Sequence, residues 1–265
     1  MDFSRRIRLI LAYDGTDFHG WQKQKSGMGI QNVVETQLTK LFDCPIKTAG
    51  SGRTDSGVHA IAQNLHFDLP FPMQHPDLVY ALNRLLPRSI RVLKASFAPE
   101  QFHSQISAKR KTYRYRVLQS DIACPLRRAF TWWVPQKLSC ETLNSLNREI
   151  IGEKDFKSFQ SAGTEVRTTV RKIEEALWTT DGDELVFTIT GNGFLKQMVR
   201  NIVGAMVEFA LHADNPLQEF QKLVALKDRT KLGPPAPPQG LCLCAVEYPA
   251  DIENQCTPLP KKITI

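Results

Sequence analysis

The sequence lacks any apolar run long enough to cross a membrane. A membrane-spanning helix needs about 20 consecutive apolar residues, and no stretch of the 265 residues approaches that length. The first residues lead directly into a predicted strand and contain no apolar core of the kind that a signal peptide needs. With 42% hydrophobic and 23% charged residues, the composition is that of a globular protein. We therefore expect a cytoplasmic protein with disorder confined to its ends.

Metal-ligand spacing is also missing. The six cysteines include no Cys-x-x-Cys pair, and the six histidines are dispersed rather than set at ligand spacing. Cys242 and Cys244 flank one residue of an apolar run, where alternation along a strand would put both on one face. Reduced, partly buried thiols are expected, and metal catalysis has little support in the sequence.

Positive charge is in excess. The net charge of +7 and the pI of about 9.1 favour a polyanionic partner, because Lys and Arg neutralise phosphates and release counterions. Net charge alone is weak support, but its distribution adds to it. Basic residues cluster with aromatics over 109–116 and with polar residues over 21–25.

Hydrophobic periodicity divides the chain into two halves of mixed helix and strand. In the first half we expect strands at 5–13, before residue 50, after Ala60 and at 90–97, with helices at 30–41 and 76–86. In the second half we expect strands from Lys111, at 171–178, 184–190 and 240–248, with helices at 139–151 and 195–210. The resulting prediction is an α+β protein with a domain over 1–108, a domain over 109–248 and a loose tail over 249–265. The two antiparallel sheets, each RRM-like or ferredoxin-like, are expected to join into one central sheet, with the active site in the cleft between the halves.

One loop stands out as a place for chemistry. Asp55 lies between Gly52 and Gly57, so backbone freedom on both sides can present its carboxylate to a substrate. Arg53, two positions earlier, could bind a phosphate. For an isolated aspartate in such a loop, a turn or cap residue is the more frequent case. Local sequence alone does not overturn that interpretation.

Four sequence segments, taken in order, favour a catalytic role for Asp55 over a turn or cap role. They are YDGTDFHGWQ over 13–22, GRTDSGVHA over 52–60, KTYRY over 111–115 and FLKQMVRNIVG over 194–204. Together they make the chain resemble the TruA family of tRNA pseudouridine synthases over roughly residues 5–248. The resemblance implies the pseudouridine synthase fold and the isomerisation of uridine to pseudouridine at positions thirty-eight to forty of the tRNA anticodon stem-loop. It also implies a homodimer with tRNA across two subunits, and no metal or organic cofactor.

The same resemblance assigns roles to single residues. Asp55 matches the essential nucleophile, and Arg53 matches a residue that contacts the RNA backbone while the target nucleotide is flipped out of its stack. Tyr113 matches the aromatic that stacks on the target uracil. Arg200 matches the arginine that pairs with the catalytic aspartate, and Leu195 would form an apolar wall beside the base. Arg200 also calls for an anionic partner on physical grounds, because the dipole at a helix start disfavours a cation.

Departures from the family pattern are small. Ser56 stands where alanine is frequent, and Lys196 with Gln197 stands where an aromatic and a histidine are common.

Two other interpretations of the function stay open. The first is a non-catalytic RNA-binding protein of two RRM-like halves, although the aromatic signatures of such domains are missing. The second is a carboxylate-dependent hydrolase, which would need a second acidic residue near Asp55 that the local sequence does not supply.

Overall fold

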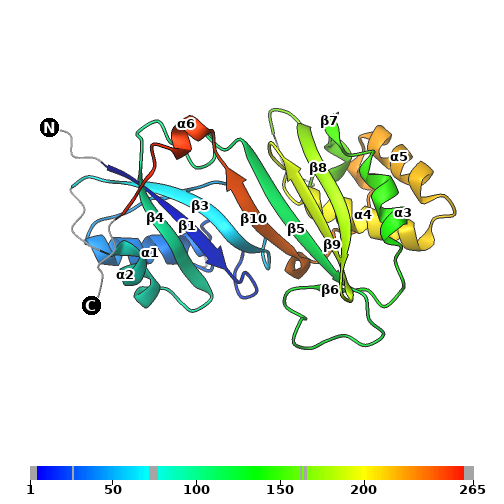
Figure 1. Ribbon diagram of the computed structural model, residues 1–265, viewed down its shortest axis with the longest axis horizontal. Coiled ribbons are helices and arrows are strands. Elements are labelled where there is room, and N and C mark those ends of the chain that lie inside the picture. Colours follow the sequence, from blue (N-terminus) through cyan, green and yellow to red (C-terminus); the bar gives the residue numbers. More distant parts are fainter. Residues whose placement is uncertain (1–4, 26, 72–76, 162, 164–165, 260–265) are drawn as a thin grey trace. The chain divides into compact units, whose positions relative to one another are not determined.

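The computed structural model describes residues 5–25, 27–71, 77–161, 163 and 166–259, which form two compact units (Figure 1). Unit 1 contains the described residues of Met1–Lys109 and Leu243–Ile265, and unit 2 is Arg110–Cys242. The boundary after Lys109 lies within one residue of the predicted boundary after residue 108. The second boundary differs, because the end of the chain returns to unit 1 instead of completing the second half or forming a separate tail.

Unit 1 contains an antiparallel sheet and helices in the expected order. Its elements are β1 Arg5–Tyr13, α1 Ile30–Phe42, β2 Ala49–Gly50, β3 His59–Leu69, α2 Leu78–Leu85, β4 Ile90–Ala98, most of β10 (Leu241–Glu247), α6 Ala250–Glu253 and β11 Thr257–Pro258. Within the unit the strand order is β11-β4-β1-β3-β10, and β2 pairs with β3. The alternation βαββαβ over its first six elements is that of the predicted ferredoxin-like half. The predicted start of the second helix at Pro76 lies outside the described residues.

The core of unit 1 follows from alternation along its central strand. Ile7, Leu9 and Leu11 are fully buried, and successive residues of a strand point to opposite faces. Leu9 lies between Leu65 of β3 and Ala95 of β4. The α1 helix adds its own apolar stripe, on which Ile30, Val34, Leu38 and Phe42 are buried. A regular sheet with a helix packed on it through one apolar face therefore supports the loops at its ends.

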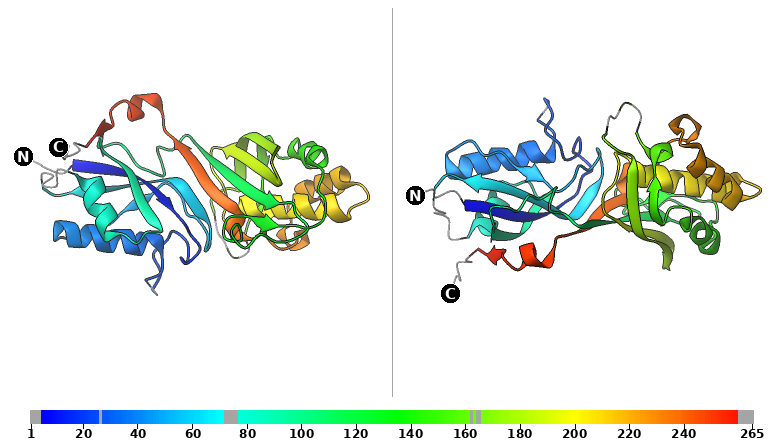
Figure 2. Two further views of the ribbon diagram at one scale, coloured as in Figure 1. Left: turned by 60° about the horizontal axis from the view of Figure 1, so that its bottom comes forward. Right: turned by 90° about the horizontal axis from the view of Figure 1, so that it is seen from above.

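The chain beyond residue 248 is not a loose tail, and that prediction was wrong for residues 249–259. In this segment α6 is followed by β11, whose Thr257 pairs with Phe97 of β4, so the segment returns to the sheet of unit 1 (Figure 2). Arg8 fastens it. The Arg8 side chain is 4% exposed, and its guanidinium donates to Glu253 at 2.7 Å and stands 4.6 Å from the centroid of the Tyr248 ring. Residues 260–265, the rest of the predicted tail, lie outside the described residues.

Unit 2 contains a second sheet with helices on one face (Figures 1 and 2). Its elements are β5 Arg110–Leu118, β6 Trp132–Trp133, α3 Cys140–Asn147, β7 Gly152–Asp155, β8 Val170–Asp181, β9 Glu184–Gly191, α4 Met198–His212 and α5 Pro216–Leu226. The strand order is β5-β9-β8-β7, and β6 lies parallel to β5. The predicted α+β class is confirmed. Whether the two sheets join into one stays a prediction.

Two helix boundaries in unit 2 differ from the predicted ones, and one helix was not predicted. The helix predicted over 139–151 is capped by Ser139, whose side chain accepts from the Thr142 amide at 3.2 Å, but it ends at Asn147. The helix predicted over 195–210 begins only at Met198, because Gln197 has a left-handed backbone. The α5 helix was not predicted. No helix in the described part of the chain is long and apolar enough to span a membrane.

Candidate functional site

The loop that carries Asp55 is fixed at the residue before it. Thr54 is buried, its hydroxyl lies 2.8 Å from the Tyr13 hydroxyl, and its carbonyl accepts from the Trp21 amide at 3.0 Å. One turn further, the Val58 amide donates to the Asp55 carbonyl at 3.1 Å. Asp55 itself is partly exposed. Its carboxylate is therefore presented at a partly open position by backbone that is held on both sides.

Two glycines of the preceding turn let the chain approach this loop closely. A Cβ atom on Gly15 would lie 2.0 Å from the Val58 carbonyl oxygen, and one on Gly20 would lie 2.5 Å from the Thr54 carbonyl oxygen. Gly20 also has a φ of +83°, which residues with a side chain rarely adopt. The segment after β1 that contains these two glycines thus packs closely against the Asp55 loop and supports it.

Side chains of β3 also support the loop through hydrogen bonds. The Gly15 amide donates to Nδ1 of the buried His59 at 3.0 Å. The Asp14 carboxylate lies 3.2 Å from the same nitrogen. On the other side, the Gln63 amide donates to the Gly52 carbonyl at 2.8 Å, and its oxygen accepts from Ser51. Sequence reasoning gave His59 and Gln63 no role, because such partners are recognised only once the strands are paired.

In unit 2, the predicted stacking residue lies on the buried side of β5. Tyr113 pairs with Ile189 of β9 and is 7% exposed. Its ring meets Phe194 edge-on, with 5.1 Å between centroids and 82° between planes. Arg114 is exposed on the other face, and Arg116 there donates to Glu184. Aromatic and basic residues therefore alternate between the two faces of this strand.

The other two predicted residues of unit 2 lie at the start of α4. Arg200 is the third residue of the helix and is 8% exposed, and its Nε donates to the Ala236 carbonyl at 2.7 Å. Leu195 is buried just before the helix. The Lys111 ammonium, two residues before Tyr113 on β5, was not singled out from the sequence. Burial lowers the pKa of Lys111 to about 8.

The five predicted residues therefore fall into two groups. Arg53, which is exposed, shares one loop of unit 1 with Asp55, and Tyr113, Leu195 and Arg200 belong to unit 2. Their convergence in one site stays a prediction. Among the described residues there is no group of three or more His, Cys, Asp or Glu side chains that could hold a metal ion.

Comparison with known proteins identifies the family. A family model described as tRNA pseudouridine synthase matches residues 9–105 and 147–249. The chain belongs to the tRNA pseudouridine synthase family. A tRNA pseudouridine synthase A from Bdellovibrio bacteriovorus is 44% identical over 260 residues, which cover 96% of this chain and 99% of the relative. Relatives of the same name from Exiguobacterium and Halalkalibacterium halodurans are 42% and 44% identical, covering 92% and 89% of this chain and 98% and 90% of their own lengths.

Membership of the tRNA pseudouridine synthase family makes the protein an isomerase and confirms the resemblance drawn from the four motifs. Arg53 and Asp55 lie in the first matched range, and Leu195 and Arg200 lie in the second. Tyr113 lies between the two matched ranges, so its assignment depends on the motif KTYRY and on its position in β5.

Proposed function

We propose that the protein isomerises uridine to pseudouridine at positions thirty-eight to forty of the tRNA anticodon stem-loop, with Asp55 as the nucleophile. The bond between N1 of the base and C1′ of the ribose breaks, the base turns, and C5 forms a new bond to C1′. The proton lost from C5 is balanced by the proton gained at N1, so the reaction needs no oxidant and no water. A carboxylate that adds covalently and then leaves suits this exchange.

The observation that carries the proposal is the construction of the Asp55 loop. A nucleophile must meet a reacting atom at a defined position, since misplacement by about 1 Å is costly to the rate. Asp55 is partly open to solvent, while Thr54 and Val58 on either side of it are buried and hydrogen-bonded. A turn residue with no role in chemistry would not need this degree of support.

The remaining roles follow the family pattern. Tyr113 stacks on the uracil and is a candidate proton acceptor at the sugar, and Leu195 adds an apolar wall beside the base. Arg200 pairs with the Asp55 carboxylate and orients it, because a buried guanidinium favours an anionic partner. Arg53, exposed beside the nucleophile, binds the RNA backbone.

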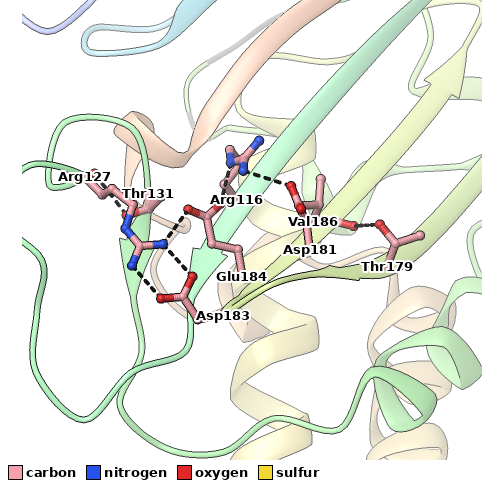
Figure 3. Close-up of polar contacts among 8 residues, drawn as sticks. All are labelled: Arg116, Arg127, Thr131, Thr179, Asp181, Asp183, Glu184 and Val186. Atoms are coloured by element: carbon pink, nitrogen blue, oxygen red, sulfur yellow. Dashed lines mark hydrogen bonds and ion pairs between the residues drawn. The ribbon is translucent and has the colours of Figure 1, made fainter.

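We also propose that the protein acts as a homodimer. The support is a group of exposed apolar side chains in one segment of unit 2, Ile122, Leu126, Phe130 and Trp133. This segment is held in place, because Arg127 binds Asp183 at two points, each 2.5 Å, and also reaches the buried Glu184 (Figure 3). Exposed apolar side chains that gather on one segment of a surface favour an interface. Light scattering should give the mass of a dimer for the unchanged protein and of a monomer for Leu126→Asp, and a monomeric unchanged protein would refute the dimer.

The activity is tested with Asp55→Asn and the matched control Asp17→Asn, which removes an exposed carboxylate from the neighbouring turn. Carbodiimide mapping of tRNA incubated with the pure protein should show pseudouridine at the three positions with the unchanged protein and with the control. Asp55→Asn should give none while still binding tRNA. Ordinary turnover by Asp55→Asn would overturn the assignment of the nucleophile. Binding of tRNA without any modification by the unchanged protein would favour a non-catalytic RNA-binding protein.

A further inference from the structure

We propose that Phe194 is a positioning residue that holds the ring of Tyr113 in the orientation needed to stack on the target base. The inference rests on the proposed function of Tyr113, and both residues belong to unit 2. Phe194 would act through Tyr113 and not on the substrate.

The first support is the contact between the two rings. Their separation of 5.1 Å and angle of 82° are those of the favoured edge-to-face arrangement of aromatic pairs. Tyr113 is 7% exposed, whereas Phe194 is only partly buried. Phe194 is thus not one of the core residues of unit 2. Its ring lies at the border of the core, in a position to limit rotation of the tyrosine ring.

The second support is that the backbone on both sides of Phe194 is fixed. The Asn192 amide donates to the Lys172 carbonyl, and the Asn192 side chain accepts from the Lys172 amide, both at 3.0 Å. After Phe194, the Lys196 carbonyl accepts from the Ser161 amide at 3.2 Å. The short segment 192–197 is therefore clamped to neighbouring parts of the unit, and the Phe194 ring is held beside Tyr113.

The third support is backbone strain at the end of this segment. Gln197 has a φ of +61° and no side-chain cap, although it carries a side chain that disfavours this conformation. At the other end, a Cβ on Gly191 would lie 2.8 Å from both the Lys172 carbonyl oxygen and the Ile173 side chain. Strained backbone persists where the surroundings hold it, often at functional sites. The strain is explained if the segment must return from β9 so that Phe194 meets Tyr113.

The test compares Phe194→Leu, which keeps an apolar side chain but removes the ring, with Phe194→Tyr, which restores it. The interaction energy of such a pair, if all of it acts in the transition state, corresponds to about three- to tenfold in rate. We expect Phe194→Leu to lower kcat for pseudouridine formation by about that factor with KM for tRNA unchanged, and Phe194→Tyr to restore kcat. A purely structural role would instead lower the melting temperature and leave kcat of the folded fraction unchanged.

A second readout needs no activity. In protein labelled with 3-fluorotyrosine, the Tyr113 resonance is assigned by its loss in Tyr113→Phe. Ring flips of Tyr113 should be slow in the unchanged protein, faster in Phe194→Leu and slow again in Phe194→Tyr. If the unsubstituted protein is active and Phe194→Leu has the same kcat and the same rate of Tyr113 ring flips, the inference about Phe194 is refuted. The proposed function is then unaffected. An inactive unchanged protein would overturn the proposed function, and this inference with it.

Discussion

Mild acid should destabilise unit 1 through a single buried histidine. His66 of β3 is 6% exposed, and its Nδ1 accepts from the Ser104 amide at 3.2 Å and lies 3.0 Å from the Ser104 hydroxyl. A backbone amide can only donate, so Nδ1 must be unprotonated in the folded protein. Protonation of the ring would break this contact and place a charge in a buried position.

The pKa of His66 is lowered from its ordinary 6.5 to about 4. Burial is the main cause, and the positive charges of Arg6 and His103 act in the same direction. Because the folded pKa lies below the unfolded one, the neutral ring stabilises the fold fully above pH 6.5, and this stabilisation is lost as the pH falls towards 4. Linkage between these two values gives a loss of about 2 kcal/mol at pH 5 and about 3 kcal/mol at pH 4 in the free energy of unfolding.

The measurement is urea unfolding at pH 7.5 and pH 5 for the unchanged protein, for His66→Gln and for His19→Gln, which alters an exposed histidine. The unchanged protein and His19→Gln should lose about 2 kcal/mol more on acidification than His66→Gln does. An NMR titration of the His66 ring gives its pKa directly. A value near 6.5, or equal losses in all three proteins, would refute the reasoning.

Three further perturbations test the supports of the site and the fold. Gly20→Ala should abolish most activity and lower stability by more than about 3 kcal/mol, whereas Gly27→Ala, also at positive φ but with open space around it, should cost only about 1 kcal/mol by thermal unfolding; equal effects would contradict the role of crowding. Arg127→Met should make the segment 119–138 several-fold more sensitive to limited proteolysis than Arg128→Met does, because Arg127 binds Asp183 and Glu184; identical cleavage rates would show that these contacts do not order the segment. Arg8→Met should lower the free energy of unfolding by about 2 kcal/mol and raise hydrogen exchange in β11, and unchanged exchange there would show that Arg8 does not fasten the C-terminal segment.

Local patterns predicted most elements, because period and capping act over short distances. β1 and β9 lie where strands were predicted, and Ser139 caps α3. The α5 helix could also have been predicted from the sequence. Asn215 accepts from the Gln218 amide ahead of Pro216, which is a recognised helix start.

What sequence could not reveal depends on pairing between distant segments. Nothing near Thr257 indicates that it pairs with Phe97, so the end of the chain was read as a tail. The same holds for the site. Asp55 was singled out by its resemblance to a family, since an aspartate between glycines is ordinary in a turn, and the supports given by His59 and Gln63 exist only after the strands are paired.

The return of the chain end to unit 1 has a consequence for biosynthesis. Residues 243–259 leave the ribosome only after the whole of unit 2, so at about 5–20 residues per second unit 1 waits on the order of ten to thirty seconds for its last strand. Until then the edge of β3 that pairs with β10 is open, and an open strand edge invites pairing with other chains. Unit 2, continuous in the sequence, can fold during this interval. Unit 2 can therefore complete its fold before unit 1 does. Chaperone binding to unit 1 should be strongest in nascent chains that are paused after residue 242.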